Sequence, residues 1–197
     1  HRYTGNFVEA LKDKQRAWEL DPLSPVTHWD ISYSYLVGGR YAEAIQWSHR
    51  TIDLAPRNLD SYICGLLASA RAGQFDEMHR LLAAARQNMQ EAGGMLELTA
   101  AHCAIMEKNL PEARRCLAQA AALSEKGQVP PGYLGYLYLL VGETDQARVW
   151  LQRGCEVNDP SLTWTEQVDL DVIAANPLTR PILDQSPLKE LREIRQR

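Results

Sequence analysis

The hexapeptide Gly5–Ala10 (Gly-Asn-Phe-Val-Glu-Ala) recurs at Gly39–Ala44 as Gly-Arg-Tyr-Ala-Glu-Ala. After an equal interval it recurs again at Gly73–Met78 as Gly-Gln-Phe-Asp-Glu-Met. The alanine that closes the phrase continues at Ala113 and Ala147, after one slightly longer interval and one equal interval. A fixed period of about 20–50 residues is typical of proteins built from stacked structural repeats. The sequence therefore predicts a repeat architecture.

The regular spacing of glycine within the phrase predicts a turn between two helices. Gly39, Gly73 and Gly142 each follow an amphipathic stretch, where a left-handed residue that ends a helix costs least if it is glycine. Lys108 stands at the same place in the remaining repeat. We expect one helix to end at each of these four positions and a second helix to begin directly afterwards.

Small residues mark the places where the two helices of a repeat should cross closely. Ser32 and Ala44 form one such pair, and Gly135 and Ala147 form another. A bulky side chain at such a crossing would overpack it, at a cost of about 1–3 kcal/mol.

Apolar residues that recur every three or four positions predict helices throughout the chain, and nothing in the pattern favours strands. The predicted helices cover residues 6–20, 25–38, 41–54, 59–72, 75–91, 94–107, 110–125, 130–141, 144–157, 161–175 and 187–196.

The repeat step of about 34 residues, the Gly-x-Tyr/Phe-x-x-Ala phrase and the closing Leu-Asp-Pro or Leu-Ala-Pro resemble the tetratricopeptide repeat family. Pro25–Asn58 is the best single copy. The resemblance implies an all-α fold, a right-handed α-solenoid of helix-turn-helix repeats with a C-terminal capping segment. The expected domains are a repeat array over residues 1–160, divided into 1–24 (partial), 25–58, 59–93, 94–127 and 128–160, followed by a helical cap over residues 161–197.

The two ends of the chain depart from the repeat. The first unit lacks its first helix, so we expect the natural protein to continue upstream of His1. After Asp159 the phase is lost, and prolines divide the segment. This ending is similar to the close of repeat arrays in bacterial signalling proteins, where the array follows a winged-helix transcription activation domain, an adenylate cyclase domain or a protein kinase domain.

Composition excludes several classes of partner. The 21 basic and 25 acidic side chains give a net charge of −4, without the basic face that nucleic acids require. The longest strongly apolar stretch, Tyr133–Val141, is about half of the ~20 residues that a membrane-spanning helix needs. The four cysteines form no CxxC pair and no zinc or haem pattern, so we expect four buried free thiols. We expect a cytoplasmic location, or a periplasmic one if the parent protein is a membrane-tethered regulator.

No catalytic motif is present in the sequence. The histidines His1, His28, His49, His79 and His102 form no metal-binding pair at helical spacing, and no phosphate-binding loop or nucleophile elbow occurs. We therefore expect no catalytic residue, no cofactor and no metal, and we expect that the chain is not an enzyme.

In the tetratricopeptide family, the first helices of successive repeats line a concave groove, and their fifth and ninth places usually meet the ligand. Carried over by position, these places form an apolar and aromatic stripe in this chain: Trp29, Tyr33, Ile63, Leu67, Leu98, His102, Gly132 and Tyr136. All of these except Gly132 have side chains suited to binding a partner. The basic residues with which co-chaperone members grip a terminal carboxylate are absent from these places. The alternative is that the C-terminal helix of the chain fills the groove.

The resemblance thus favours a non-catalytic interaction module that binds a protein or peptide segment, within a bacterial signalling or transcription-regulatory protein. Two alternatives stay open: an accessory, non-catalytic region of an adenylate cyclase or protein kinase, and an assembly scaffold of the cell envelope. A homodimer is also possible, because a second copy of the chain could cover the stripe.

Overall fold

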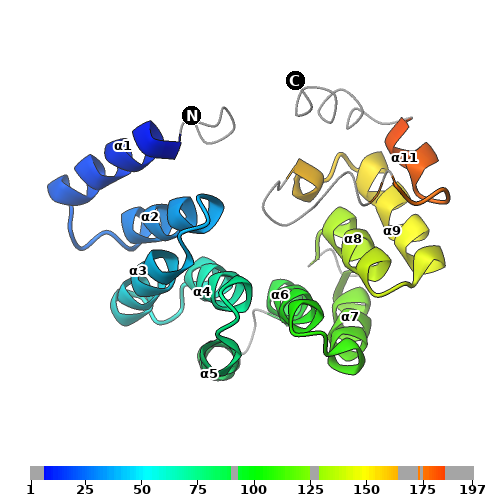
Figure 1. The fold of residues 1–197 in the computed structure, drawn as a ribbon, viewed down its shortest axis with the longest axis horizontal. Coiled ribbons are helices and arrows are strands. Elements are labelled where there is room, and N and C mark those ends of the chain that lie inside the picture. The colour runs from blue at the N-terminus through cyan, green and yellow to red at the C-terminus, as the bar shows by residue number, and fades with distance from the viewer. Residues whose placement is uncertain (1–6, 90–92, 125–128, 164–172, 174, 185–197) are drawn as a thin grey trace. The chain divides into compact units, whose positions relative to one another are not determined.

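The computed structural model describes residues 7–89, 93–124, 129–163, 173 and 175–184 (Figure 1). These residues form helices and connecting turns and contain no strand. The helices are α1 (Phe7–Leu20), α2 (Pro25–Val37), α3 (Tyr41–Leu54), α4 (Leu59–Arg71), α5 (Phe75–Asn88), α6 (Gly93–Met106), α7 (Leu110–Ser124), α8 (Pro131–Leu140), α9 (Thr144–Glu156), the 3-10 helix η1 (Pro160–Thr163) and α11 (Arg180–Asp184).

The expected all-α class is confirmed, and helices α1 to α9 lie within three residues of their predicted bounds. The helix expected over 161–175 differs: its first residues form the 3-10 helix η1 instead. Residues 164–172 and the helix expected over 187–196 lie outside the described residues, and so does most of the expected cap.

The chain divides into two compact units, His1–Ala92 and Gly93–Arg197. In the first unit, each of the helices α1 to α5 packs against the next, and α2 also contacts α4 (Figure 1). Short loops join these helices, so successive helices run antiparallel. The second unit repeats this pattern, because α6, α7, α8 and α9 pack in order and α6 also contacts α8. Such packing is that of a helical repeat.

The turn inside each helix pair has the same hydrogen bonds in every copy. After α2, Gly39 has φ +72°, its N–H donates to Leu36 O at 3.2 Å, and Arg40 N–H donates to Tyr35 O at 2.9 Å. These two bonds are the Schellman motif, which satisfies the carbonyls left free at a helix end. Equivalent pairs of bonds close α4 at Gly73, α6 at Lys108 and α8 at Gly142.

Lys108 adopts the left-handed conformation of its glycine counterparts, with φ +64°. Its N–H donates to Ile105 O at 3.0 Å, and Asn109 N–H donates to Ala104 O at 2.8 Å. A β-carbon in this conformation costs roughly 1–2 kcal/mol. The repeat geometry is therefore kept at this turn although the residue that favours it is missing.

Close crossings of helices occur at the small residues that the sequence singled out. Ser32 Oγ donates a hydrogen bond to Ala44 O at 2.8 Å, and both residues are fully buried. A methyl group added to Gly135 would lie 2.7 Å from Leu151 N and 3.1 Å from Ala147 O. The backbones of α8 and α9 thus approach too closely for any side chain at Gly135.

Among the helices of the described ranges, none is both long and apolar enough to cross a bilayer.

Candidate partner-binding surface

The first unit carries four of the seven predicted groove residues, on two neighbouring helices. Trp29 and Tyr33 lie on α2 and are half-buried. Ile63 and Leu67 lie on α4 and are buried, with Leu67 completely inaccessible. Because residues at spacings of three and four share a helix face, each helix presents one row of side chains. We call the accessible part of the two rows the α2–α4 surface, which comprises Val26, Trp29, Tyr33 and Asp60, whereas Ile63 and Leu67 are buried.

Two aromatic rings on α2 stack on each other in the accessible part of this surface. The Trp29 and Tyr33 rings are stacked, with centroids 5.8 Å apart and planes 30° from parallel. Val26, one turn earlier on the same face, is 64% exposed. Large apolar groups that stay partly in water, yet are held in one arrangement, are the type of side chain that contributes most to binding energy at interfaces.

The thiol of Cys64 on α4 is buried and interacts with side chains of α2. It takes part in hydrogen bonds with the side chains of Ser32 and Trp29. Burial, followed by repulsion from the Asp60 carboxylate, raises the pKa of this thiol to about 12. Cys64 is therefore protonated at neutral pH and cannot act as a nucleophile, since only the thiolate attacks.

A polar clamp holds α1 beside α2. Lys14 Nζ donates to Ser34 Oγ at 2.6 Å and to Asp30 O at 3.0 Å, and it lies 3.2 Å from Asp30 Oδ1. The Lys14 side chain is only 17% exposed. Its charge is thus satisfied by α2.

The remaining three groove residues, Leu98, His102 and Tyr136, lie in the second unit and are all buried. His102 Nδ1 lies 2.6 Å from Tyr133 Oη, and their rings meet edge-on at 5.8 Å. His102 therefore forms an internal hydrogen bond between α6 and α8.

A segment after α9 covers the start of α8. Leu162 packs directly on Gly132, where an added methyl group would lie 2.5 Å from Leu162 Cγ. Asp159 Oδ2 accepts from Gly132 N–H at 2.6 Å, and Ser161 Oγ accepts from Tyr133 N–H at 3.0 Å. The groove place at Gly132 is thus occupied by the chain itself, through residues that the sequence analysis placed at the edge of the cap.

A second aromatic cluster, which the sequence analysis did not assign to the groove, lies where α1, α2 and α3 meet. The Trp47 ring meets Trp18 edge-on at 5.6 Å and His28 edge-on at 5.2 Å, and the Arg50 guanidinium lies 4.7 Å from its centroid. His28 Nε2 bonds to Pro22 O at 2.8 Å, whereas its Nδ1 is buried without a partner among the described residues. These contacts hold the partial first repeat on the second.

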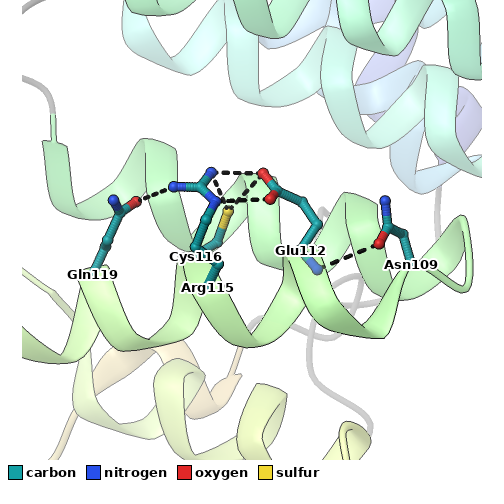
Figure 2. Close-up of polar contacts among 5 residues, drawn as sticks. All are labelled: Asn109, Glu112, Arg115, Cys116 and Gln119. Carbon is teal, nitrogen blue, oxygen red and sulfur yellow. Dashed lines mark hydrogen bonds and ion pairs between the residues drawn. The ribbon is translucent and has the colours of Figure 1, made fainter.

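A cluster of polar side chains links neighbouring turns of α7. On α7, Arg115 binds the Glu112 carboxylate with Nε at 2.7 Å and Nη2 at 2.6 Å, and Arg115 Nη1 donates to Gln119 Oε1 at 2.9 Å (Figure 2). The hydrogen bond to Glu112 raises the pKa of Arg115. Asn109 Oδ1 accepts from Glu112 N–H at 3.3 Å and caps the start of the helix. Each of these contacts joins residues at most four positions apart, so the cluster stabilises α7 itself.

Cys116 lies in the same cluster, with Sγ 3.5 Å from Glu112 Oε1 (Figure 2). Burial, then the negative charges of Glu97 and Glu112, raise its pKa to about 12. It is therefore also a protonated thiol. No group of three or more His, Cys, Asp or Glu residues suited to a metal ion occurs in the part of the chain that the structure describes.

Comparison of the chain with protein-family models and with curated protein sequences finds no match.

Proposed function

We propose that the chain is a non-catalytic protein-interaction module whose helix pairs are tetratricopeptide repeats, and that it binds a peptide or helix of a partner protein on the α2–α4 surface. Repeats of this type stack with a right-handed rotation, and a terminal capping segment closes their last apolar face.

The repeat type is supported by the turns. Positions 39, 73, 108 and 142 share one left-handed conformation and one pair of hydrogen bonds, and they recur at nearly equal intervals. The small residues at helix crossings keep the same phase. Both the turn conformations and the small residues at the helix crossings agree with the sequence resemblance. Amino-acid composition by itself would produce neither of them at a regular spacing.

The binding role is supported above all by the stacked Trp29 and Tyr33 rings. The two rings are stacked on each other and remain partly exposed, whereas Leu98, His102 and Tyr136 at equivalent places are buried. A rigid aromatic pair contributes a large contact area at a small cost in side-chain entropy. The first unit therefore offers the better anchor for a partner.

We also propose that the module belongs to a larger bacterial signalling or transcription-regulatory protein of the cytoplasm. The support is the resemblance of the proline-divided ending from Asp159 onward to the close of arrays in such proteins.

Selection of peptides from a displayed random library on the immobilised chain tests the proposal. The wild-type chain should enrich peptides with apolar anchors at spacings of three or four. The double variant Trp29→Ala/Tyr33→Ala should lose this enrichment, whereas Leu54→Ala, which removes an exposed apolar residue on α3, should retain it. If both variants enrich the same peptides as the wild type, the α2–α4 surface is not the binding site.

A further inference from the structure

We propose that the turn between α1 and α2 is a second docking surface, which binds an amphipathic helix of a partner protein that carries Lys or Arg beside its apolar face. We call it the α1–α2 turn surface, which comprises Leu20, Leu23 and Val26. Only Val26 is shared with the α2–α4 surface, so the inference goes beyond the proposed function and does not depend on it.

The α1–α2 turn surface holds the three most exposed large apolar side chains in the described part of the chain. Leu20 is 82% exposed and Leu23 is 73% exposed, and Val26 follows them. All three lie between positions 20 and 26. Single apolar side chains on a protein surface are ordinary, whereas neighbouring ones mark contact with another molecule.

Hydrogen bonds hold the backbone of this turn in one conformation. Ser24 N–H donates to Asp21 O at 3.2 Å, which closes the turn around Leu23. The side chain of His28 is buried, and its Nε2 lies 2.8 Å from Pro22 O. Because the backbone at Leu23 is already ordered, a partner that binds there loses little affinity to ordering it.

The equivalent turn between α3 and α4 has the same pattern of hydrogen bonds. Asn58 N–H donates to Ala55 O at 2.9 Å, and Tyr62 Oη donates to Pro56 O at 3.3 Å. Each of these residues lies one repeat step after its counterpart in the first turn. The repeat therefore gives both turns the same shape, and the second serves as a reference for the first.

The two turns carry different side chains at their exposed places. Arg57 stands where the first turn has Leu23, and Asp60 stands where it has Val26. Since the second turn forms with charged residues at these places, the shape of the turn does not require apolar ones. The exposed apolar residues of the first turn thus need a reason outside the folding of the repeat, and contact with a partner supplies it.

The charges around the α1–α2 turn surface indicate the kind of partner. Glu19 and Asp21 are exposed and stand on either side of Leu20 in the sequence. Neither carboxylate forms a hydrogen bond or ion pair among the described residues. No Lys or Arg occurs between Arg16 and Arg40. The apolar side chains are therefore accompanied by negative charge.

This charge discriminates between possible occupants. A second copy of the chain, docked by the same patch, would bring identical acids together across a two-fold axis, where they repel. An anionic lipid surface would be repelled as well. The described residues contain no strand edge for an extended segment. An amphipathic helix bordered by Lys or Arg satisfies both the aliphatic side chains and the carboxylates.

The test begins with a displayed library of helical peptides that are random on one face. The library is selected on the wild-type chain and depleted on the double variant Leu20→Ser/Leu23→Ser. We expect the surviving peptides to combine large aliphatic residues with Lys or Arg beside them. If no peptide survives depletion, or if the survivors have no excess of Lys and Arg, the inference is wrong.

Dissociation constants of the best surviving peptide, measured by fluorescence anisotropy, identify the responsible residues. Leu20→Ser/Leu23→Ser should weaken binding about tenfold or more. Leu54→Ser, which makes the same change at the equivalent place in the next repeat, should leave the dissociation constant unchanged. Glu19→Lys/Asp21→Lys should reverse the preference, so that a version of the peptide with Glu in place of Lys and Arg binds more tightly. An unchanged preference in this variant would contradict the assigned role of the two acids.

Two further measurements exclude the other occupants and sites. Trp29→Ala/Tyr33→Ala should bind the selected peptide as the wild type does, and loss of binding would assign the peptide to the α2–α4 surface instead. Sedimentation of the wild-type chain alone and of Leu20→Ser/Leu23→Ser should give the same mass. A wild-type oligomer that this variant dissociates would identify a second copy as the occupant and overturn the inference. Helix content is compared for all variants.

Discussion

Asp159 Oδ2 accepts a hydrogen bond from the backbone N–H of Gly132 at 2.6 Å, across 27 residues of sequence. Its other oxygen accepts from Ser161 N–H at 2.9 Å, so one buried carboxylate caps the start of α8 and of η1. Pro130, the residue before α8, has no side chain that could provide this cap. A residue that follows α9 thereby caps the start of α8.

Removing this carboxylate should destabilise the second unit. Asp159→Ala leaves two backbone N–H groups without acceptors, so we expect a loss of about 2–3 kcal/mol in the free energy of unfolding. Asp145→Ala, which removes an acid at an exposed position in the first turn of α9, should cost less than about 1 kcal/mol. Urea denaturation followed by circular dichroism measures both changes. Equal midpoints for the two variants would contradict the double cap.

The left-handed turn residues predict opposite effects of two substitutions. Lys108→Gly should stabilise the chain by about 1 kcal/mol, because glycine adopts φ +64° without strain on a β-carbon. Gly142→Ala, at φ +83° in the next turn, should destabilise it by about 1–2 kcal/mol. Thermal denaturation gives the sign directly. A lower melting temperature for Lys108→Gly would show that the side chain has a role that outweighs the strain.

The close crossings predict intolerance of added volume. Ala44→Leu and Ala147→Leu should each destabilise by about 1–3 kcal/mol, since both alanines are fully buried. Ala42→Leu makes the same change at an exposed position on α3 and should stay within about 0.5 kcal/mol of wild type. Were the three denaturation midpoints equal, the assigned phase of the repeat would be wrong.

The thiols should differ in reactivity. None of the four cysteines forms a disulfide, and Cys155 is more accessible than the buried Cys64, Cys103 and Cys116. A pKa raised to about 12 at Cys64 and Cys116 keeps both protonated well above pH 8, and the thiolate is the reactive form. A disulfide-exchange reagent at pH 8 should therefore modify Cys155 first and reach four thiols only after denaturation. Two or fewer thiols in the denatured, unreduced chain would exclude four free cysteines.

Local signals explain which features could be predicted from sequence. Glycine and the regular repeat step predicted the turns at Gly39, Gly73 and Gly142, because the residue itself favours their conformation. At Lys108 the residue type gives no such signal, and the repeat step alone predicted the turn there. The cap that Asp159 provides for Gly132 was also beyond local reasoning, which considers only the helix start that follows Asp159.

For the candidate surface, too, the sequence predicted the position of residues but not their burial. Repeat position predicted which residues share a helix face, but it does not indicate what covers them. Leu98, His102 and Tyr136 occupy places equivalent to Trp29 or Tyr33, yet they are buried, whereas the pair on α2 stays partly exposed.

The most direct test of the account is the dissociation constant of the best selected peptide, measured by calorimetry with the wild-type chain and with Trp29→Ala/Tyr33→Ala. Loss of both aromatic anchors should weaken binding by about 2 kcal/mol or more, which corresponds to roughly 30-fold, while the helix content stays unchanged. An unchanged dissociation constant in a fully folded double variant would contradict the claim that this aromatic pair anchors a partner.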